Sequence, residues 1–246
     1  MATSRKVQRQ PAYILARHPF SESSLVLDAF CRDHGRVPLM AKGARRLKSP
    51  HRGIVQAFFP LALDWSGRRE LVTLVRAELV GAVPRLAGAP LMCAWYANEL
   101  LLKFLHRGDP HEALFSAYES LLAELAEDDP EWALRRFEAA LLADVGYGLV
   151  LEREVIGQQP IEARRGYLYI IGRGPVEDGA AGFAGTPVRG ETLLALHSGA
   201  RPGTAARREA KILIRTLLAG LMEGRHLKSR SVFMQMYGPQ AAVDDG

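Results

Sequence analysis

The spacing of hydrophobic residues changes once along this chain, from every second residue to about every 3.6 residues, near Pro84. Before that point, short runs alternate apolar and polar side chains, which is typical of half-buried strands. After it, apolar residues recur every three or four positions, as on amphipathic helices. Strands gathered at one end and helices at the other predict an α+β fold. We therefore expect a β domain in residues 1–80 and a helical domain in residues 81–246.

The β domain contains five runs with strand character, separated by turn residues. In residues 24–32, Leu25, Leu27, Ala29 and Cys31 share one face, as expected of a buried strand face. Five strands in about 80 residues fit a small closed barrel, first of all an OB-fold, although an SH3-like barrel or a small sandwich would give a similar pattern. The runs cover residues 12–17, 24–32, 37–41, 54–65 (interrupted by Pro60) and 71–80.

The second domain is predicted to be mainly helical. Asp-Pro pairs at 109–110 and 129–130 favour helix starts, because Asp is a good N-cap and Pro fits the first helical position. Residues 152–189 interrupt the helical pattern with Gly-rich sequence and one predicted strand at 166–171, so we expect a small irregular insert there. The expected helices cover residues 91–105, 110–125, 130–145, 192–197 and 204–222.

Positive charge is concentrated in the β domain. Residues 1–80 hold 14 Lys and Arg against 6 Asp and Glu, whereas residues 81–246 hold 18 against 21, and the whole chain carries +5. No acidic residue occurs between Asp33 and Asp64. A field of this kind attracts polyanions, nucleic acid foremost. A solvated loop, an acidic protein and an anionic membrane surface are alternatives, but no amphipathic helix supports membrane binding there.

No motif points to catalysis. The chain has no GxxxxGK[ST] phosphate loop and no GxSxG nucleophile elbow, and its seven histidines are scattered. With Cys31 and Cys93 alone, a disulfide framework and a four-cysteine zinc site are excluded. We find no membrane-spanning run and no secretory signal. The sequence therefore predicts a cytoplasmic, non-enzymatic protein without metal or cofactor.

Ordered motifs along nearly the whole chain resemble the bacterial RecO family of recombination mediators. No single motif is decisive, but their combination in this order is specific. They comprise Arg36–Arg46 (RVPLMAKGARR) preceded by Ser21–Ser24, then Gln56–Leu61, Trp65–Gly67, Tyr96–Leu100, Asp109–His111 with Leu114, Phe115 and Tyr118, Leu134–Glu138, Gly146–Leu149 and Leu227–Arg230.

The resemblance implies an OB barrel joined to a helical domain, and a non-catalytic role in recombinational DNA repair. Such proteins bind single- and double-stranded DNA, anneal complementary strands and help load RecA onto strands coated by single-strand-binding protein (SSB). RecR and the acidic C-terminal tail of SSB are the implied partners, and the nucleoid is the implied location. Some family members carry a four-cysteine zinc module in the region equivalent to 152–189. That region has no cysteine here, so we expect a metal-free version.

Two groups of cations are the candidate DNA contacts. Lys and Arg neutralise phosphates and release counterions, which gives affinity without sequence readout. Single-strand binding usually adds aromatic stacking, for which Phe58, Phe59, Trp65 and Tyr13 are available, although a core role is favoured for each. The first group is Arg36, Lys42, Arg45, Arg46, Lys48 and Arg52, and the second is Lys228 and Arg230, for which helix C-terminal charge or an ion pair is the alternative.

The SSB tail combines acidic residues with a terminal apolar residue, so its site needs a cation beside an apolar groove. Arg135 and Arg136 are the candidate cations, with Leu134, Phe137 and Leu141 lining the groove. Alternatively, one of the arginines forms an ion pair, more readily with another helix than with its own.

Two other functions fit the same sequence. An RNA-binding OB module would prefer RNA over single-stranded DNA in competition. A protein adaptor, whose basic half faces an acidic partner, would not bind DNA even at low salt.

Overall fold

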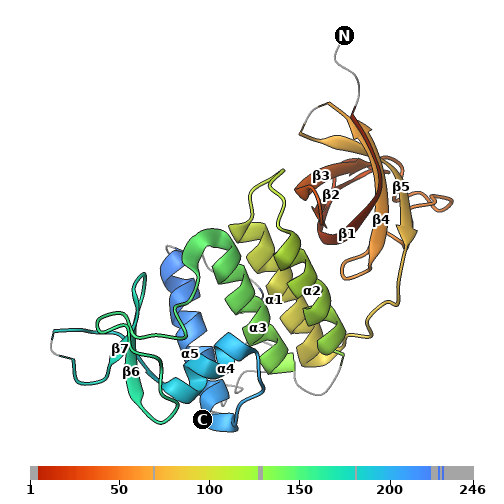
Figure 1. Ribbon diagram of the computed structural model, residues 1–246. Helices are drawn as coiled ribbons and strands as arrows, with labels where there is room; N and C mark the ends of the chain where they lie inside the picture. The colour runs from red at the N-terminus through yellow and green to blue at the C-terminus, as the bar shows by residue number, and fades with distance from the viewer. Residues whose placement is uncertain are drawn as a thin grey trace, which may run out of the picture. The chain divides into compact units, whose positions relative to one another are not determined.

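The computed structural model describes residues 5–68, 70–126, 130–180, 182–222, 227 and 229 (Figure 1). The described residues form two compact units. The first contains the N-terminal barrel, the helix α1 (Gly88–Phe104), Leu227 and Ser229, and the second runs from His111 through the helix α5 (Thr204–Leu221). The first unit therefore extends past the predicted boundary at residue 80, because α1 packs on the barrel.

The first unit is built on a closed five-stranded barrel. Its hydrogen-bonded order is β1-β2-β3-β5-β4, with β4 returning to β1 and with β3 and β5 parallel. This is the Greek-key barrel of an OB-fold, so the predicted fold class is confirmed. The strands are β1 (Arg5–Pro19), β2 (Leu25–Cys31), β3 (Gly35–Ala41), β4 (Leu61–Gly67) and β5 (Val72–Leu79).

The barrel core is filled by the apolar side chains that alternate along the strands. Leu27, Ala29 and Cys31 of β2 are fully buried in it, as the alternating pattern predicts, and Leu25 packs at its margin. The strand β1 is longer than predicted because it serves two neighbours in turn: residues 12–19 pair with β2, and residues 5–12 pair with β4. The chain between residues 54 and 60 is turn and coil, so β4 begins only after Pro60, which lacks a backbone N–H.

The outer face of β1 is covered by α1. Asn98, 1% exposed, donates an amide hydrogen bond to the carbonyl oxygen of Leu15 (3.0 Å). Arg36 on β3 makes the second connection: its Nη1 donates to the carbonyl oxygens of Leu102 (2.7 Å) and Leu105 (2.9 Å) at the end of α1. The Arg36 Nη2 lies 3.1 Å from the Asp28 carboxylate on β2. One guanidinium therefore joins two strands to the C-terminal carbonyls of a helix, where a cation is favourable.

The turn between β2 and β3 lies close to the segment that follows α1. Gly35 has φ +59°, a left-handed conformation that glycine adopts without strain. A Cβ at this position would lie 1.8 Å from the carbonyl oxygen of Asp109. Any side chain here would displace the segment that follows α1.

The second unit packs α2 (Glu112–Glu124) against α3 (Pro130–Leu142), and α3 and α4 (Gly190–Ser198) against α5. Trp132 of α3 donates its indole N–H to the carbonyl oxygen of Gly199 (3.2 Å). The helix α2 begins at Glu112 rather than at the predicted Pro110, with His111 as its N-cap residue. After α3, the segment Ala143–Tyr147 continues as a π-helical turn. Among the described residues, no helix is both long enough and apolar enough to cross a membrane.

The insert is more regular than predicted. Besides β6 (Gly166–Ile170), which was expected, it contains β7 (Gly174–Glu177) and β8 (Thr186–Arg189), in the antiparallel order β7-β6-β8. These two strands are only four residues long and each contains a Pro, so alternation did not reveal them. Two tyrosine hydroxyls of β6 accept backbone N–H groups: Tyr167 from Glu162 (2.9 Å) and Tyr169 from Val150 (3.1 Å).

The Glu154 side chain adds a similar contact. Its carboxylate, in a residue only 5% exposed, accepts the N–H groups of Ile156 (2.8 Å) and Gln159 (3.4 Å). Side-chain acceptors thus order the loops of the insert by hydrogen bonds. Among the described residues, no group of three or more His, Cys, Asp or Glu side chains is placed to hold a metal ion.

Removing one of these acceptors should destabilise the second unit. Tyr169→Phe removes the acceptor of the partly buried Val150 N–H, so we expect a loss of about 1 kcal/mol in unfolding free energy, measured by urea denaturation. Burial raises the pKa of Tyr169 to about 12. Because the pKa of Tyr169 is higher in the folded than in the unfolded protein, the folded state favours the neutral hydroxyl. The wild type should therefore become less stable as the pH rises from about 10 towards 12.

Tyr147→Phe is the matched control, since Tyr147 is 54% exposed; it should change the unfolding free energy by less than about 0.5 kcal/mol. A metal chelator should leave the melting temperature of the wild type unchanged. A clear fall on chelation would show that a metal, and not the tyrosine hydroxyls, orders the insert.

Candidate nucleic-acid interface

The loop after β3 carries a cluster of exposed cations. We call residues 42–52 the basic loop. It is a succession of tight turns, in which the N–H groups of Arg46, Ser49 and Arg52 each donate to the carbonyl three residues earlier. Five of the six predicted DNA contacts of the first group lie on it and are exposed: Lys42, Arg45, Arg46, Lys48 and Arg52.

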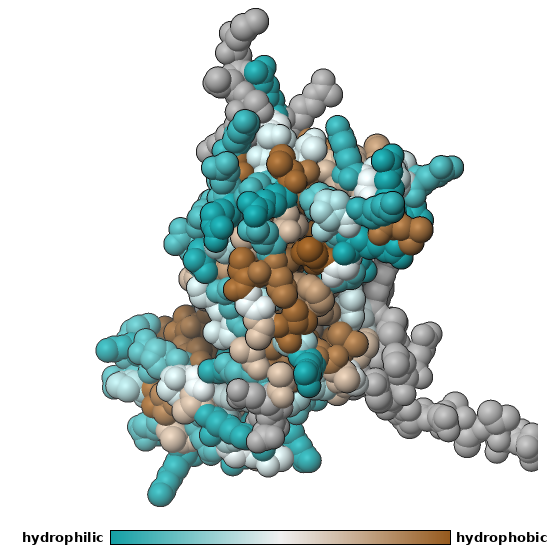
Figure 2. All heavy atoms as spheres, turned by 90° about the vertical axis from the view of Figure 1, so that its right-hand side faces the viewer, coloured by the Kyte–Doolittle hydropathy of each residue, from teal (hydrophilic) through white to brown (hydrophobic). Residues whose placement is uncertain are grey.

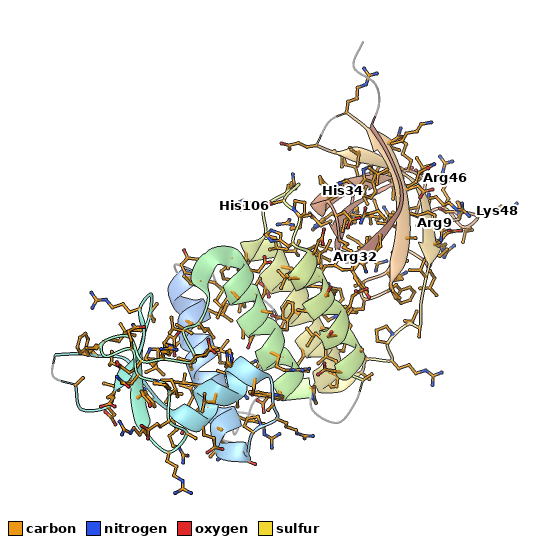
Figure 3. All side chains as sticks on the ribbon, in the orientation of Figure 1. Arg9, Arg32, His34, Arg46, Lys48 and His106 are labelled. Carbon is orange, nitrogen blue, oxygen red and sulfur yellow. The ribbon has the colours of Figure 1, made fainter. Side chains whose placement is uncertain are left out.

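None of these five cations forms an ion pair with an Asp or Glu side chain within the part of the chain that the structure describes. Their positive charges therefore face solvent without neutralisation. Figure 3 shows Arg46 and Lys48 extending outward from the barrel. The side of the barrel seen in the upper part of Figure 2 is mainly hydrophilic, with isolated hydrophobic residues. This surface can bind a polyanion through phosphate neutralisation.

The turn between β1 and β2 is hydrogen-bonded to the basic loop. We call Phe20–Ser24 the serine turn. Arg45 donates its backbone N–H to the carbonyl of Ser23 (2.9 Å) and its Nη1 to the carbonyl of Ser21 (2.8 Å). The N–H of Gly43, which has φ +66°, donates to the Ser24 hydroxyl (3.4 Å). These bonds hold the loop and the turn in one arrangement before any ligand arrives.

Two hollows lie at neighbouring positions along these segments. The first, about 430 Å³, is lined by Phe20, Ser21, Ser23, Ser24, Lys42 and Arg46 among others. The second, about 330 Å³, includes Arg17, Arg45 and Arg52 in its lining. The buried His51 also lines the second hollow, and burial lowers the pKa of its imidazole, so His51 is neutral at pH 7 and adds no positive charge. Arginines and a lysine thus supply the charge of both hollows.

Arg36, the sixth residue of the predicted group, has a different environment. Its side chain is 12% exposed, and its guanidinium binds Asp28 and the carbonyls at the end of α1. The structure therefore separates Arg36 from the basic loop and gives it a structural role. Charge alone did not reveal this, because the partner carbonyls are 66 and 69 residues away in the sequence.

The second predicted patch consists of Lys228 and Arg230, and both lie outside the described residues. Between them, Ser229 is described, and its N–H (2.9 Å) and hydroxyl (2.7 Å) both donate to the Glu99 carboxylate on α1.

The four aromatic residues that were candidates for base stacking lie in the barrel or helix packing or are partly buried against the core. Tyr13, Phe58 and Trp65 are at most 7% exposed, and Phe59 packs against the barrel core, which confirms the favoured core role. Phe20, which the sequence did not single out, is 64% exposed and lines the first hollow. The sequence does contain a signal for it, since an aromatic residue directly before the polar run Ser21–Ser24 lies outside every alternating strand pattern.

The predicted SSB-tail residues lie on α3. Leu134, Phe137 and Leu141 are at most 6% exposed and belong to the core. Arg135 is 2% exposed, and its Nη1 lies 2.7 Å from the Glu138 carboxylate one turn further along the same helix. Arg136 pairs with Glu124 of α2 and keeps a side-chain exposure of 38%. Of the two arginines, Arg136 is the one that solvent and a ligand can reach.

The two cysteines are not joined in a disulfide, and Cys31 lies in the barrel core. Burial raises the pKa of the Cys31 thiol well above its usual range. A thiol in this environment stays protonated, so it behaves as a small apolar core residue.

Comparison with known proteins covers both units. Residues 5–83 match the family described as Recombination protein O N terminal, and residues 86–231 match Recombination protein O C terminal. A DNA repair protein RecO of Aromatoleum aromaticum is 44% identical over 237 residues, covering 96% of this chain and 99% of that protein. One of Dechloromonas aromatica is 44% identical, covering 94% and 97%. One of Laribacter hongkongensis is 40% identical over the full length of both chains.

The separate roles of Arg36 and the basic loop can be tested directly. Arg36→Ala leaves Asp28 buried without its cation and leaves two helix carbonyls without a donor, so unfolding free energy in urea should fall by about 2–4 kcal/mol. The exposed Arg52→Ala should change it by less than about 0.5 kcal/mol. An Arg36→Ala protein of wild-type stability would contradict the structural role.

Proposed function

Because this chain belongs to the recombination protein O (RecO) family, we propose that it is a non-catalytic mediator that binds DNA through the basic loop of its OB barrel. A role in DNA repair follows from the family itself. The observation that carries the DNA-binding proposal is the set of five exposed cations on one loop, none paired with a carboxylate among the described residues.

The chemistry of this loop fits binding without sequence readout. Lys and Arg side chains neutralise phosphates on either single- or double-stranded DNA and release the counterions condensed there. Neutralising two strands at once also lowers the repulsion between them, so the same surface would favour annealing of complementary strands. Loading of RecA onto SSB-coated strands would then combine this surface with contacts to RecR and SSB. With DNA as its ligand, the protein would act at the nucleoid in the cytoplasm.

The salt dependence of binding tests the basic loop. In the triple variant Lys42→Ala/Arg46→Ala/Lys48→Ala, the loss of three phosphate contacts should flatten the log–log salt slope for a single strand by about 2. Fluorescence anisotropy of a labelled single-stranded oligonucleotide at several salt concentrations measures this slope.

The matched control removes equal charge from the second unit. Arg164, Arg173 and Arg208 are exposed, and their alanine triple variant should keep the wild-type slope. If both triples flatten the slope equally, the basic loop is not the site. RNA that outcompetes DNA of the same sequence would favour the RNA-binding alternative. An absence of DNA binding at low salt would favour the protein adaptor.

We further propose that the acidic SSB tail binds at α3, through Arg136. A tail carboxylate would have to displace Glu124 from the Arg136 guanidinium. The buried Arg135 would instead stabilise the helix through Glu138, and Leu134, Phe137 and Leu141 would support α3 from the core without contacting the tail.

Two single substitutions should move the affinity for a labelled SSB tail peptide in opposite directions. Arg136→Ala should weaken binding about tenfold, since it removes a charge-assisted hydrogen bond. Glu124→Gln should strengthen binding, because it removes the competing carboxylate. Arg208→Ala is the control and should have no effect. Equal affinity for all four proteins would place the tail elsewhere.

A further inference from the structure

Among the described residues, the two most exposed large hydrophobic side chains lie on the two segments that form the basic surface of the barrel. Leu47, 83% exposed, is in the middle of the basic loop, and Phe20, 64% exposed, is the first residue of the serine turn. A single exposed apolar residue is ordinary on a protein surface. Phe20, however, is aromatic and lines the first hollow together with Lys42 and Arg46.

The rest of this hollow offers hydrogen-bond donors and no carboxylate. Lys42 supplies an ammonium group and Arg46 a guanidinium, and three serine hydroxyls line the same space. The Ser21 hydroxyl already accepts the N–H of Ser24 (3.2 Å), and the Ser24 hydroxyl accepts the N–H of Gly43. Each of these hydroxyls keeps its own hydrogen to donate. Donors of this kind, with two cations, select an anionic oxygen such as that of a phosphate.

A phosphate next to an aromatic ring is the chemistry of a nucleotide. Deepening the function proposed above, we propose that the first hollow is a subsite for one unpaired nucleotide, whose phosphate binds Lys42, Arg46 and the serine hydroxyls and whose base stacks on Phe20. The volume of about 430 Å³ is within the range of small-ligand pockets. In a duplex, neighbouring bases already cover both faces of each base, so Phe20 would give the basic loop a preference for single strands.

The hollow is held in shape before binding. Arg45 fixes the serine turn through the carbonyls of Ser21 and Ser23, and the N–H of Phe20 donates to the carbonyl of Ser24 (3.1 Å). A ligand would therefore pay little entropy to order the site. The second hollow begins at the neighbouring residues Pro19, Leu25 and Ala44, so the backbone of the same strand could continue past Arg45 towards Arg52.

The test compares single- and double-stranded binding of Phe20 variants. Stacking of one base on an aromatic side chain is lost in Phe20→Leu, so affinity for a single strand should fall about tenfold, whereas duplex affinity should change less than about twofold. Phe20→Trp should restore single-strand binding. The salt slope should be that of the wild type in every Phe20 variant, because no cation is removed.

Val75→Ala is the matched control, since Val75 is an exposed apolar residue (59%) of the same barrel that does not line the hollow. Circular dichroism verifies that each variant is folded. An equal loss for single and double strands, or no loss with Phe20→Leu, would overturn the subsite. If the Lys42/Arg46/Lys48 variant flattens the salt slope while Phe20→Leu binds as the wild type, only the subsite fails. If the wild type binds no DNA, the proposed function itself fails.

Discussion

The contact of Arg36 with Asp28 and with the last carbonyls of α1 is the interaction on which the first unit depends. It joins β2 and β3 to the helix that covers β1, and Asn98 reinforces the same contact through Leu15. A buried guanidinium with these partners cannot also neutralise DNA. The cations of the acid-free stretch therefore have two different roles. Arg36 stabilises the packing of the first unit, whereas the cations of the basic loop remain exposed and available to a ligand.

Most of the architecture could be predicted from the spacing of apolar residues. Alternation in β2 identified Leu27, Ala29 and Cys31 as one buried face, and they lie in the barrel core. Alternation did not predict the first half of β1, because residues 5–10 are mainly basic and polar and are ordered by pairing with β4. Nor did the sequence predict that α1 belongs to the same compact unit as the barrel. The packing of α1 on the barrel depends on contacts between residues more than 60 positions apart, such as Arg36 with Leu102, and a local pattern does not contain them.

The candidate site was predicted in part. The lack of acidic residues between Asp33 and Asp64 correctly indicated an unpaired basic loop, because a chain segment without carboxylates cannot neutralise its own cations. Charge could not distinguish Arg36 from Lys42, since burial and not sequence separates them. For the same reason, Arg135 and Arg136 looked equivalent, whereas one is buried beside Glu138 and the other is half-exposed beside Glu124. The sequence did not identify Phe20 as a site residue, because its place in the site depends on the hollow that the basic loop and the serine turn form together.

Amide hydrogen exchange of the full chain, with and without a single-stranded oligonucleotide, tests the placement of DNA on the basic loop most directly. Backbone N–H groups in the serine turn and the basic loop, such as those of Gly43, Arg45 and Arg52, should exchange more slowly when DNA is bound. Those of α5 in the second unit should exchange at the same rate in both states. Slower exchange confined to the second unit, with no change in residues 42–52, would contradict the placement of DNA on the barrel.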